Sequence, residues 1–255
     1  MEVLNVKGLS KNFGGIQVLQ NVSFSVHTGE KLVIIGPNGA GKTTLLNLLN
    51  GQLSPTSGQI YLFGEEITSL PTHRRVHLGQ GRSFQISSLC PNLTILDNML
   101  LAIQGTQPCR FQIFRSITIY KYLYDKAQEL LGAMGLWEKR DDPVQTLSSG
   151  EQRGLEVALG LASEQRLLLL DEPSSGLTAG ECTNVVKIIR NRSRDAAVVI
   201  IDHDMDLVFN IAERIIVLYY GQIIAEGKPE EIQRNARVKE IYMGIQENSG
   251  NVKTY

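Results

Sequence analysis

Cysteine, aromatic residues and long apolar runs are all scarce in this sequence. Its 255 residues include 3 cysteines and only 6% aromatic residues. Cys90, Cys109 and Cys182 lie far apart and form no C-x-x-C pair, which argues against a disulfide framework or a zinc site and indicates a reduced, cytosolic protein. The longest apolar runs, residues 167–170 and 196–201, have the length of strands, whereas a membrane-spanning helix needs about 20 apolar residues.

A strong excess of one charge is also missing. The chain carries 25 basic and 26 acidic residues, a formal net charge of -1, so nothing in the balance predicts nucleic acid as a partner. The first five residues have neither the basic start nor the apolar core of a signal peptide. Hydrophobic residues make up 42% of the chain, and we expect a single α/β domain over residues 1–255.

The most informative motif follows a short apolar run at residues 32–35. It fits G-x-x-x-x-G-K-[ST], the phosphate-binding loop, and leads into the apolar start of a helix. Glycines let backbone N–H groups converge on an anion, and a helix N-terminus adds partial positive charge. The sequence therefore predicts a nucleoside triphosphate site formed by Gly36, Pro37, Asn38, Gly39, Ala40, Gly41, Lys42, Thr43 and Thr44.

The rest of the chain alternates between strand and helix patterns. Residues 2–28 have the alternation and glycine turns of antiparallel strands, and helical periods fill much of residues 95–162. Strand patterns return at residues 167–171 and 197–202, with a helix between them, which indicates a parallel sheet. We interpret residues 90–162 as a helical subdomain inserted into the sheet domain.

Two further segments can act on a phosphate. Asp171 and Glu172 follow an apolar strand, and paired carboxylates at that end of a sheet suit holding Mg²⁺ and accepting a proton from water; the alternative is an acidic turn. Ser148 and Glu151 form a capping box, and a helix start with Ser148 and Gly150 is also an anion site. Two anion sites for one nucleotide need an explanation.

With these motifs in this order, the chain resembles the ATP-binding subunits of ABC transporters over essentially its whole length. Leu147-Ser148-Ser149-Gly150-Glu151-Gln152, hereafter the signature segment, stands where that family usually has LSGGQ. The resemblance implies a P-loop ABC ATPase core with a mixed, mostly parallel sheet, an N-terminal antiparallel β subdomain and an inserted α-helical subdomain. It also implies a head-to-tail dimer, in which the signature segment of one chain closes over ATP held by the phosphate loop of the other.

The resemblance assigns further site residues. Gln85, after Arg82-Ser83-Phe84, is similar to the loop glutamine that senses Mg²⁺ and the attacking water. His203 resembles the switch histidine near the γ-phosphate, and Phe13 the aromatic residue that stacks on adenine. Expected roles are then Glu172 as general base, with His203 and Gln85 in support, and Thr43, Gln85 and Asp171 for Mg²⁺. A lone glutamine or histidine is usually only a polar turn residue, and an aromatic residue in a hairpin often packs in the core.

Two positions depart from the family pattern. Ser149 stands where most members have glycine, while the hydroxyl of Ser148 and the flexible backbone of Gly150 are kept. Thr178 stands where many members have an aspartate, so it can hydrogen-bond but cannot form an ion pair across the dimer.

Within the family the chain is most similar to importer subunits for branched-chain amino acids and related polar solutes such as urea. The resemblance implies transmembrane permease subunits as partners, a second ATPase subunit of the same or a similar kind, and a place at the cytoplasmic face of the cell membrane. Alternatives are a kinase with a phosphate loop, to which the signature segment is foreign, and a non-transport ABC ATPase, which usually has tandem halves or long coiled coils.

The C-terminus carries a helix-start signal at Pro229, followed by acidic residues. Apolar residues continue a helical pattern toward Tyr242, and Gly244 is a natural stop. We therefore predict a docked helix that ends near Gly244, and a mobile tail over residues 246–255.

Overall fold

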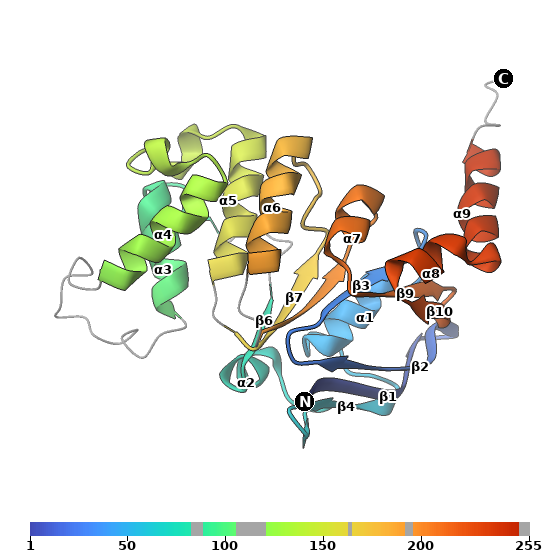
Figure 1. The fold of residues 1–255 in the computed structure, drawn as a ribbon. Coiled ribbons are helices and arrows are strands. Elements are labelled where there is room, and N and C mark those ends of the chain that lie inside the picture. The colour runs from blue at the N-terminus through green and yellow to red at the C-terminus, as the bar shows by residue number, and fades with distance from the viewer. Residues whose placement is uncertain (83–88, 106–120, 163–164, 192–195, 250–255) are drawn as a thin grey trace.

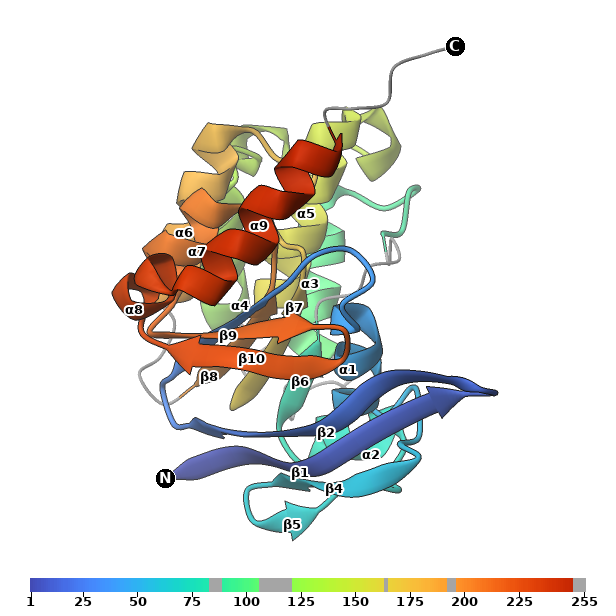
Figure 2. The same cartoon turned by 90° about the vertical axis from the view of Figure 1, so that its right-hand side faces the viewer.

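The chain forms two sheets and a set of helices that cover the larger sheet (Figures 1 and 2). The structure, a computed structural model, describes residues 1–82, 89–105, 121–162, 165–191 and 196–249. Within these residues, no helix is both long and apolar enough to cross a membrane.

The smaller sheet is antiparallel, as predicted for the N-terminal region. Gly14, with a left-handed φ of 56°, and Gly15 turn the chain so that Phe13 pairs with Ile16. The strand order is β2-β1-β4-β5, with β1 at Glu2–Phe13, β2 at Ile16–His27, β4 at Ser57–Leu62 and β5 at Glu65–Glu66.

The larger sheet has six strands in the order β10-β9-β3-β8-β7-β6. Its neighbours from β9 to β6 pair in parallel, and only β10 is antiparallel, so the predicted mixed, mostly parallel sheet is confirmed. The strands are β3 (Lys31–Ile35), β6 (Gln80–Arg82), β7 (Leu167–Asp171), β8 (Ala197–Ile201), β9 (Arg214–Tyr219) and β10 (Gln222–Gly227).

Helices form in the regions where the sequence predicts them, and those at Thr72–His77 and Met205–Ile211 were not predicted. In the described part of the chain, the 3-10 turns η3 at Trp137–Lys139 and η4 at Val144–Thr146 lie between α4 and α5. The helices are α1 (Lys42–Leu49), α2 (Thr72–His77), α3 (Ile95–Gly105), α4 (Lys121–Ala133), α5 (Ser149–Ala162), α6 (Ala179–Asn191), α7 (Met205–Ile211), α8 (Pro229–Arg234) and α9 (Ala236–Ser249).

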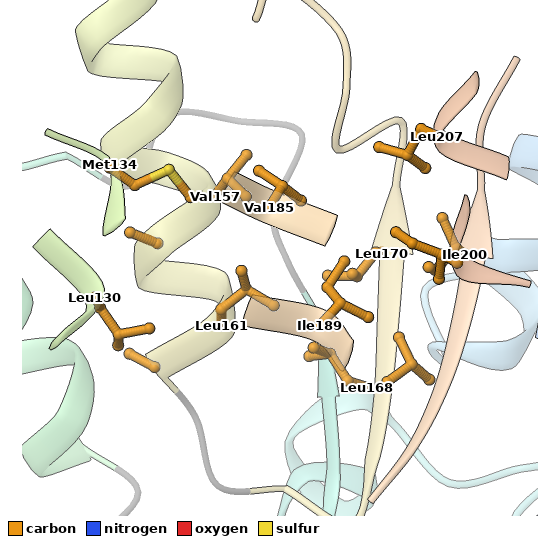
Figure 3. Packing of buried hydrophobic residues seen from close by; sticks show 14 of the residues in the cluster. Leu130, Met134, Val157, Leu161, Leu168, Leu170, Val185, Ile189, Ile200 and Leu207 are labelled. Carbon is orange, nitrogen blue, oxygen red and sulfur yellow. The ribbon is translucent and has the colours of Figure 1, made fainter. Parts of the chain in front are cut away.

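Two apolar clusters lie on opposite faces of the larger sheet. Because successive side chains of a strand point to opposite faces, Leu168 and Leu170 of β7 join one cluster, and Leu167 and Leu169 join the other. Helices α3 to α9 contribute to the first cluster, and α1 and the antiparallel sheet to the second. Figure 3 shows the part of the first cluster between α4, α5, α6, α7 and the strands β7 and β8. A strand that is buried on both faces reads as a continuous apolar run, which is the pattern seen in the sequence.

The C-terminal helix differs from its predicted form. It is divided at Asn235, whose side chain accepts hydrogen bonds from the backbone N–H groups of Arg237 and Val238 and so begins a new helix, α9. The expected stop at Gly244 is wrong, since α9 continues to Ser249. Glycine lowers helix stability by only about 1 kcal/mol and does not by itself end a helix. Residues 250–255, the rest of the predicted tail, lie outside the described residues.

Arg75 holds the far end of α1, the helix that begins at the predicted phosphate loop. It is 1% exposed, and its guanidinium donates to the backbone carbonyl oxygens of Leu48, Leu49, Leu70 and Thr68. Burial lowers the pKa of Arg75 to about 10, so the side chain keeps its positive charge at neutral pH. A cation at a helix C-terminus also interacts favourably with the helix dipole.

Replacing Arg75 tests this support. Arg75→Ala removes four hydrogen bonds to backbone carbonyl groups and opens a cavity, so the free energy of unfolding should fall by roughly 3 kcal/mol, although the carbonyls of Leu48 and Leu49 keep donors in the N–H of Gly51 and the amide of Gln80. Urea denaturation followed by circular dichroism measures the change. Arg74→Ala, at the neighbouring exposed position, is the matched control and should change stability by no more than about 0.5 kcal/mol. Equal stability of the two variants would show that Arg75 does not support α1.

Candidate functional site

The predicted phosphate loop connects β3 to α1, as its strand and helix context indicated. Gly41 begins α1 with a left-handed φ of 101°, and Gly39 has a φ of 79°. These values are accessible to glycine and costly for other residues, so the motif's glycines are needed for the path of the loop. The exposed Asn38 and Gly39 form its tip, and Thr43 is exposed on the first turn of α1.

Close backbone packing supports the loop from behind. A Cβ atom on Gly36 would lie 2.2 Å from the carbonyl oxygen of Leu218 in β9, and one on Gly41 would lie 2.9 Å from Cδ2 of Leu19 in β2. The N–H group of Gly221 also donates to the carbonyl oxygen of Ala40 over 3.0 Å. The loop is therefore fixed against both sheets.

Lys42 lies along this loop rather than in solvent. The residue is 8% exposed, and its ammonium donates to the carbonyl oxygens of Gly36, at 2.6 Å, and Pro37, at 3.1 Å. Burial lowers the pKa of Lys42, and the negative charges of Glu172 and Asp171 oppose that shift. The two carboxylates predicted to converge on the phosphate loop are thus close enough to influence its lysine.

The ends of β7 and β8 bring the predicted catalytic residues together. Asp171 ends β7 and is 3% exposed, and Glu172 follows it with a left-handed φ of 46°. The carboxylate oxygen Oε1 of Glu172 lies 3.6 Å from Nδ1 of His203, which follows β8. Because both strands run in parallel, their C-terminal residues meet at one edge of the sheet, as expected for a ligand site.

Asp202 is a residue of this site that we did not predict. It is fully buried, and its carboxylate accepts hydrogen bonds from the N–H and the hydroxyl of Ser174 and from the N–H groups of His203 and Asp204. It therefore joins the loop after β7 to the loop after β8. The only signal in the sequence was an aspartate placed directly after an apolar strand and before His203.

The signature segment leads into α5 and contains the predicted capping box. The N–H and hydroxyl of Ser148 donate to the Glu151 carboxylate over 2.9 and 2.7 Å, and the Glu151 N–H lies 3.4 Å from the Ser148 hydroxyl. Lys139 also donates to Glu151. The hydrogen bonds from Lys139 and then from Ser148 lower the pKa of Glu151 to about 2. Gly150 lies in the first turn of α5 and is half-buried.

The remaining predicted residues have different surroundings. Phe13 ends β1 and is 45% exposed, with the ammonium of Lys11 5.0 Å from the centre of its ring. Thr178 is an N-cap of α6, because its N–H and hydroxyl donate to Glu181 over 2.7 and 2.8 Å. Gln85 lies outside the described residues.

Arg153 is a second residue that the sequence reasoning missed. It stands in the second turn of α5, and its guanidinium donates to the backbone carbonyl oxygens of Glu172 and Ser175. These bonds join α5, the helix that begins in the signature segment, to the loop after β7. A single arginine on an amphipathic helix gives no signal of such a contact, because its partners are backbone atoms distant in sequence.

Comparison with known families identifies the family of the chain. Residues 19–175 match the family described as ABC transporter, and residues 222–247 match that described as branched-chain amino acid ATP-binding cassette transporter. The first match contains the phosphate loop, the signature segment, Asp171 and Glu172.

Individual relatives match over nearly their full length. The probable branched-chain amino acid transport ATP-binding protein LivG of Archaeoglobus fulgidus is 32% identical, with 97% of this chain and 98% of the relative covered. BraF of Pseudomonas aeruginosa, a high-affinity branched-chain amino acid transport ATP-binding protein, is 35% identical, with coverage of 95% and 98%. The lipopolysaccharide export system ATP-binding protein LptB of Haemophilus influenzae is 33% identical, with coverage of 96% and 99%.

Solved structures show the same fold. The ADP conformation of MJ1267, an ATP-binding cassette of an ABC transporter, has a TM-score of 0.78 at 30% identity and covers 96% of this chain and 99% of its own. A dimeric post-hydrolysis state of the cassette MJ0796, bound to ADP and Pi, has a TM-score of 0.74 at 26% identity, with coverage of 89% and 98%. On these family, sequence and structure matches, the chain belongs to the ABC transporter family as an ATP-binding subunit that hydrolyses ATP.

Proposed function

We propose that this chain drives the import of branched-chain amino acids from the cytoplasmic face of the cell membrane, together with permease subunits and a second ATPase subunit. The observation that carries the proposal is the match of residues 222–247, which contain β10, α8 and most of α9, to the branched-chain amino acid cassette family. The relatives LivG and BraF support it. The similar identity to LptB, a protein of an export system, makes export the alternative, and a urea-type importer is a further one.

In this proposal the phosphate loop holds the ATP phosphates with the backbone N–H groups of residues 38–44 and the ammonium of Lys42. The ammonium of Lys42 donates to the carbonyl oxygens of Gly36 and Pro37. When ATP binds, the ammonium can exchange these bonds for stronger, charge-assisted bonds to the phosphates. The exposed ring of Phe13 stacks on the adenine. Catalysis is then mainly positioning and electrostatic stabilisation, as in other phosphoryl transfers.

Glu172 is the proposed general base. Its carboxylate, 35% exposed, accepts a proton from the water that attacks the γ-phosphate, and the neighbouring His203 steadies that phosphate. The distance of 3.6 Å between Glu172 and His203 allows both side chains to act on one phosphate. Gln85 is proposed to orient the same water.

The residues near the loop also fit Mg²⁺. The hydroxyl of Thr43 and the carboxylate of Asp171 are oxygen donors of the kind this ion prefers, and Gln85 is the third proposed donor. When bound between protein and nucleotide, Mg²⁺ neutralises charge on the β- and γ-phosphates. Asp171 is held in place for this task by its position at the end of the buried strand β7.

The dimer gives the signature segment its role. We propose one ATP-binding domain over residues 1–255 with a helical subdomain inserted at about 90–162, and two such domains packed head to tail. Ser148, Gly150 and Glu151 then contact the nucleotide held by the partner's phosphate loop. The dimeric MJ0796 cassette supports the dimer as such.

Residues 84–99 are the proposed contact with a permease subunit. In the described part, the side chain of Asn98, 4% exposed, bonds to both the N–H and the carbonyl oxygen of Cys90 and fixes the loop before α3. Leu93 of this loop is 38% exposed. Such a rigid, partly apolar loop, adjoining Gln85 in sequence, is suited to pass on the effect of hydrolysis.

Lys42→Ala tests the nucleotide site. The variant loses the point charge on the phosphates, so ATP should bind roughly 10- to 100-fold more weakly and hydrolysis should stop. Titration with a fluorescent ATP analogue and a phosphate-release assay measure both. Lys187→Ala, on the exposed face of α6, should leave both unchanged. Normal turnover of Lys42→Ala would remove the phosphate loop from the proposed mechanism.

Glu172→Gln tests the general base and the shared sites together. An amide cannot accept the proton, so turnover should fall about a hundredfold or more while ATP still binds. The trapped ATP state should be a dimer in size-exclusion chromatography with light scattering, in Mg-ATP but not in Mg-ADP. Glu65→Gln, exposed on β5, is the matched control and should keep wild-type turnover. A Glu172→Gln chain that stays monomeric in Mg-ATP would contradict the head-to-tail model.

Uptake in the source organism tests the solute and the direction. Cells whose gene carries Glu172→Gln should lose accumulation of radiolabelled leucine and keep that of urea, because only the branched-chain system lacks its ATPase. Affinity purification of the tagged chain from membranes should also recover hydrophobic permease subunits. Unchanged leucine uptake would exclude the branched-chain proposal, and loss of urea uptake instead would favour the urea-type alternative.

A further inference from the structure

Each of the three guanidinium nitrogens of Arg153 donates one hydrogen bond, to α5 or to the loop after β7. Nε donates to the carbonyl oxygen of Ser175 over 3.1 Å, and Nη2 donates to that of Glu172 over 3.0 Å. The third nitrogen, Nη1, bonds Glu156 one turn further along α5 over 3.0 Å. The side chains of Arg153 and Glu156 are 19% and 16% exposed, so the bonds to Glu156 and to the Glu172 carbonyl are partly shielded from solvent, whereas the bond to Ser175 lies at the surface.

The carbonyl that Arg153 holds belongs to a residue in an unfavourable backbone conformation. Glu172 has a φ of 46°, in the left-handed region that non-glycine residues seldom adopt. Its N–H donates to the carbonyl oxygen of Ile201 over 2.7 Å, and its carbonyl also accepts from the N–H of Ser175 over 3.1 Å. The direction of the Glu172 side chain depends on this conformation, because φ sets where its Cβ points.

The same loop is held from the other side by Asp202. Residues 172–176, hereafter the Glu172 loop, contain Ser174, which is 7% exposed and donates both its N–H and its hydroxyl to the Asp202 carboxylate. Asp202 also accepts from the N–H of His203 over 2.7 Å. The buried Asp202 carboxylate therefore fixes the position of the Glu172 loop relative to His203.

We propose that Arg153 is a positioning residue, which with Asp202 clamps the Glu172 loop and makes the placement of the Glu172 carboxylate depend on the position of α5. The inference rests on the proposed role of Glu172 as general base. Because α5 begins at the signature segment, a shift of this helix would move the Arg153 side chain and, through its hydrogen bond, the carbonyl group of Glu172. The state of the signature segment is in this way linked to the general base of the same chain.

The chemistry of arginine is required for this link. A guanidinium presents a planar fork of donors in fixed directions, whereas the ammonium of lysine is a compact point charge. Lysine at this position keeps the charge beside Glu156 but cannot reach the carbonyl oxygens of Ser175 and Glu172 with two fixed donors. Arg153→Lys therefore removes the two bonds to the Glu172 loop while it keeps the positive charge beside Glu156.

The test compares the hydrolysis and the nucleotide binding of full-length Arg153→Lys. The kcat for ATP should fall by roughly tenfold or more, because small displacements of a catalytic group are costly. The KM and the affinity for mant-ATP should stay within about twofold, because Lys42 and the phosphate loop are untouched. Arg234→Lys, exposed on α8, is the matched control and should keep the wild-type kcat.

A double-mutant cycle with Asp202→Asn distinguishes a clamp from two separate structural roles. The asparagine amide has one acceptor oxygen in place of two, so the bonds from Ser174, His203 and Asp204 cannot all be kept. If both residues hold the same loop, the double variant should lose much less than the product of the two single losses in kcat. Multiplicative losses would overturn the clamp.

Two outcomes separate the inference from the proposed function. A wild-type kcat in Arg153→Lys, with Glu172→Gln inactive, would overturn the inference and leave the general base intact. A fall in mant-ATP affinity and melting temperature that parallels the fall in kcat would show that Arg153 only stabilises the fold. Glu156→Gln, which removes only the carboxylate that orients Arg153, should lower kcat to a smaller extent with unchanged mant-ATP affinity, and an unchanged kcat would contradict the orienting step.

Discussion

The parallel pairing of β3, β8 and β7 is the constraint on which the site depends. In the register of the sheet, Ile34 pairs with Ile201, and Ile201 pairs with Asp171. The phosphate loop, Asp202 and Glu172 each follow one of these strands directly, so the sheet delivers them to one edge without further adjustment. The two apolar clusters on the faces of the sheet keep the strands in this register, since a slip by one residue would exchange the faces of every side chain.

The sequence predicted those parts of the molecule whose signal is local. The phosphate loop lies between an apolar strand and a helix, and its glycines have the left-handed or tightly packed backbone that the motif requires. The capping box at Ser148 and Glu151 likewise needs only residues three apart. The strand ends of a parallel sheet predicted that Glu172 would approach the phosphate loop, and the family resemblance added His203, which lies 3.6 Å from Glu172.

The missed features depend on contacts between distant segments. Arg153 and Asp202 act on backbone groups whose positions are set by the tertiary structure, so the neighbours of Arg153 give no indication of its role and those of Asp202 give only its place after an apolar strand and before His203. The length of α9 was misjudged because Gly244 has only a weak preference against the helix, and the separate start at Asn235 comes from a local capping bond. Thr178 was considered only because it lacks the charge of an aspartate, whereas in the structure it caps α6 through its bonds to Glu181.

Charge in the site is divided between buried groups that hold backbone and exposed groups that can react. Asp202 is fully buried and binds N–H groups of the loops after β7 and β8, and Arg153 binds two carbonyl groups of the loop after β7. The side chains of Glu172 and His203 are 35% and 65% exposed. A buried charge must be compensated by fixed hydrogen bonds, which makes it a rigid anchor, whereas an exposed one can approach a phosphate at little cost in desolvation. The anchors thus set the geometry, and the reactive side chains remain accessible to the nucleotide.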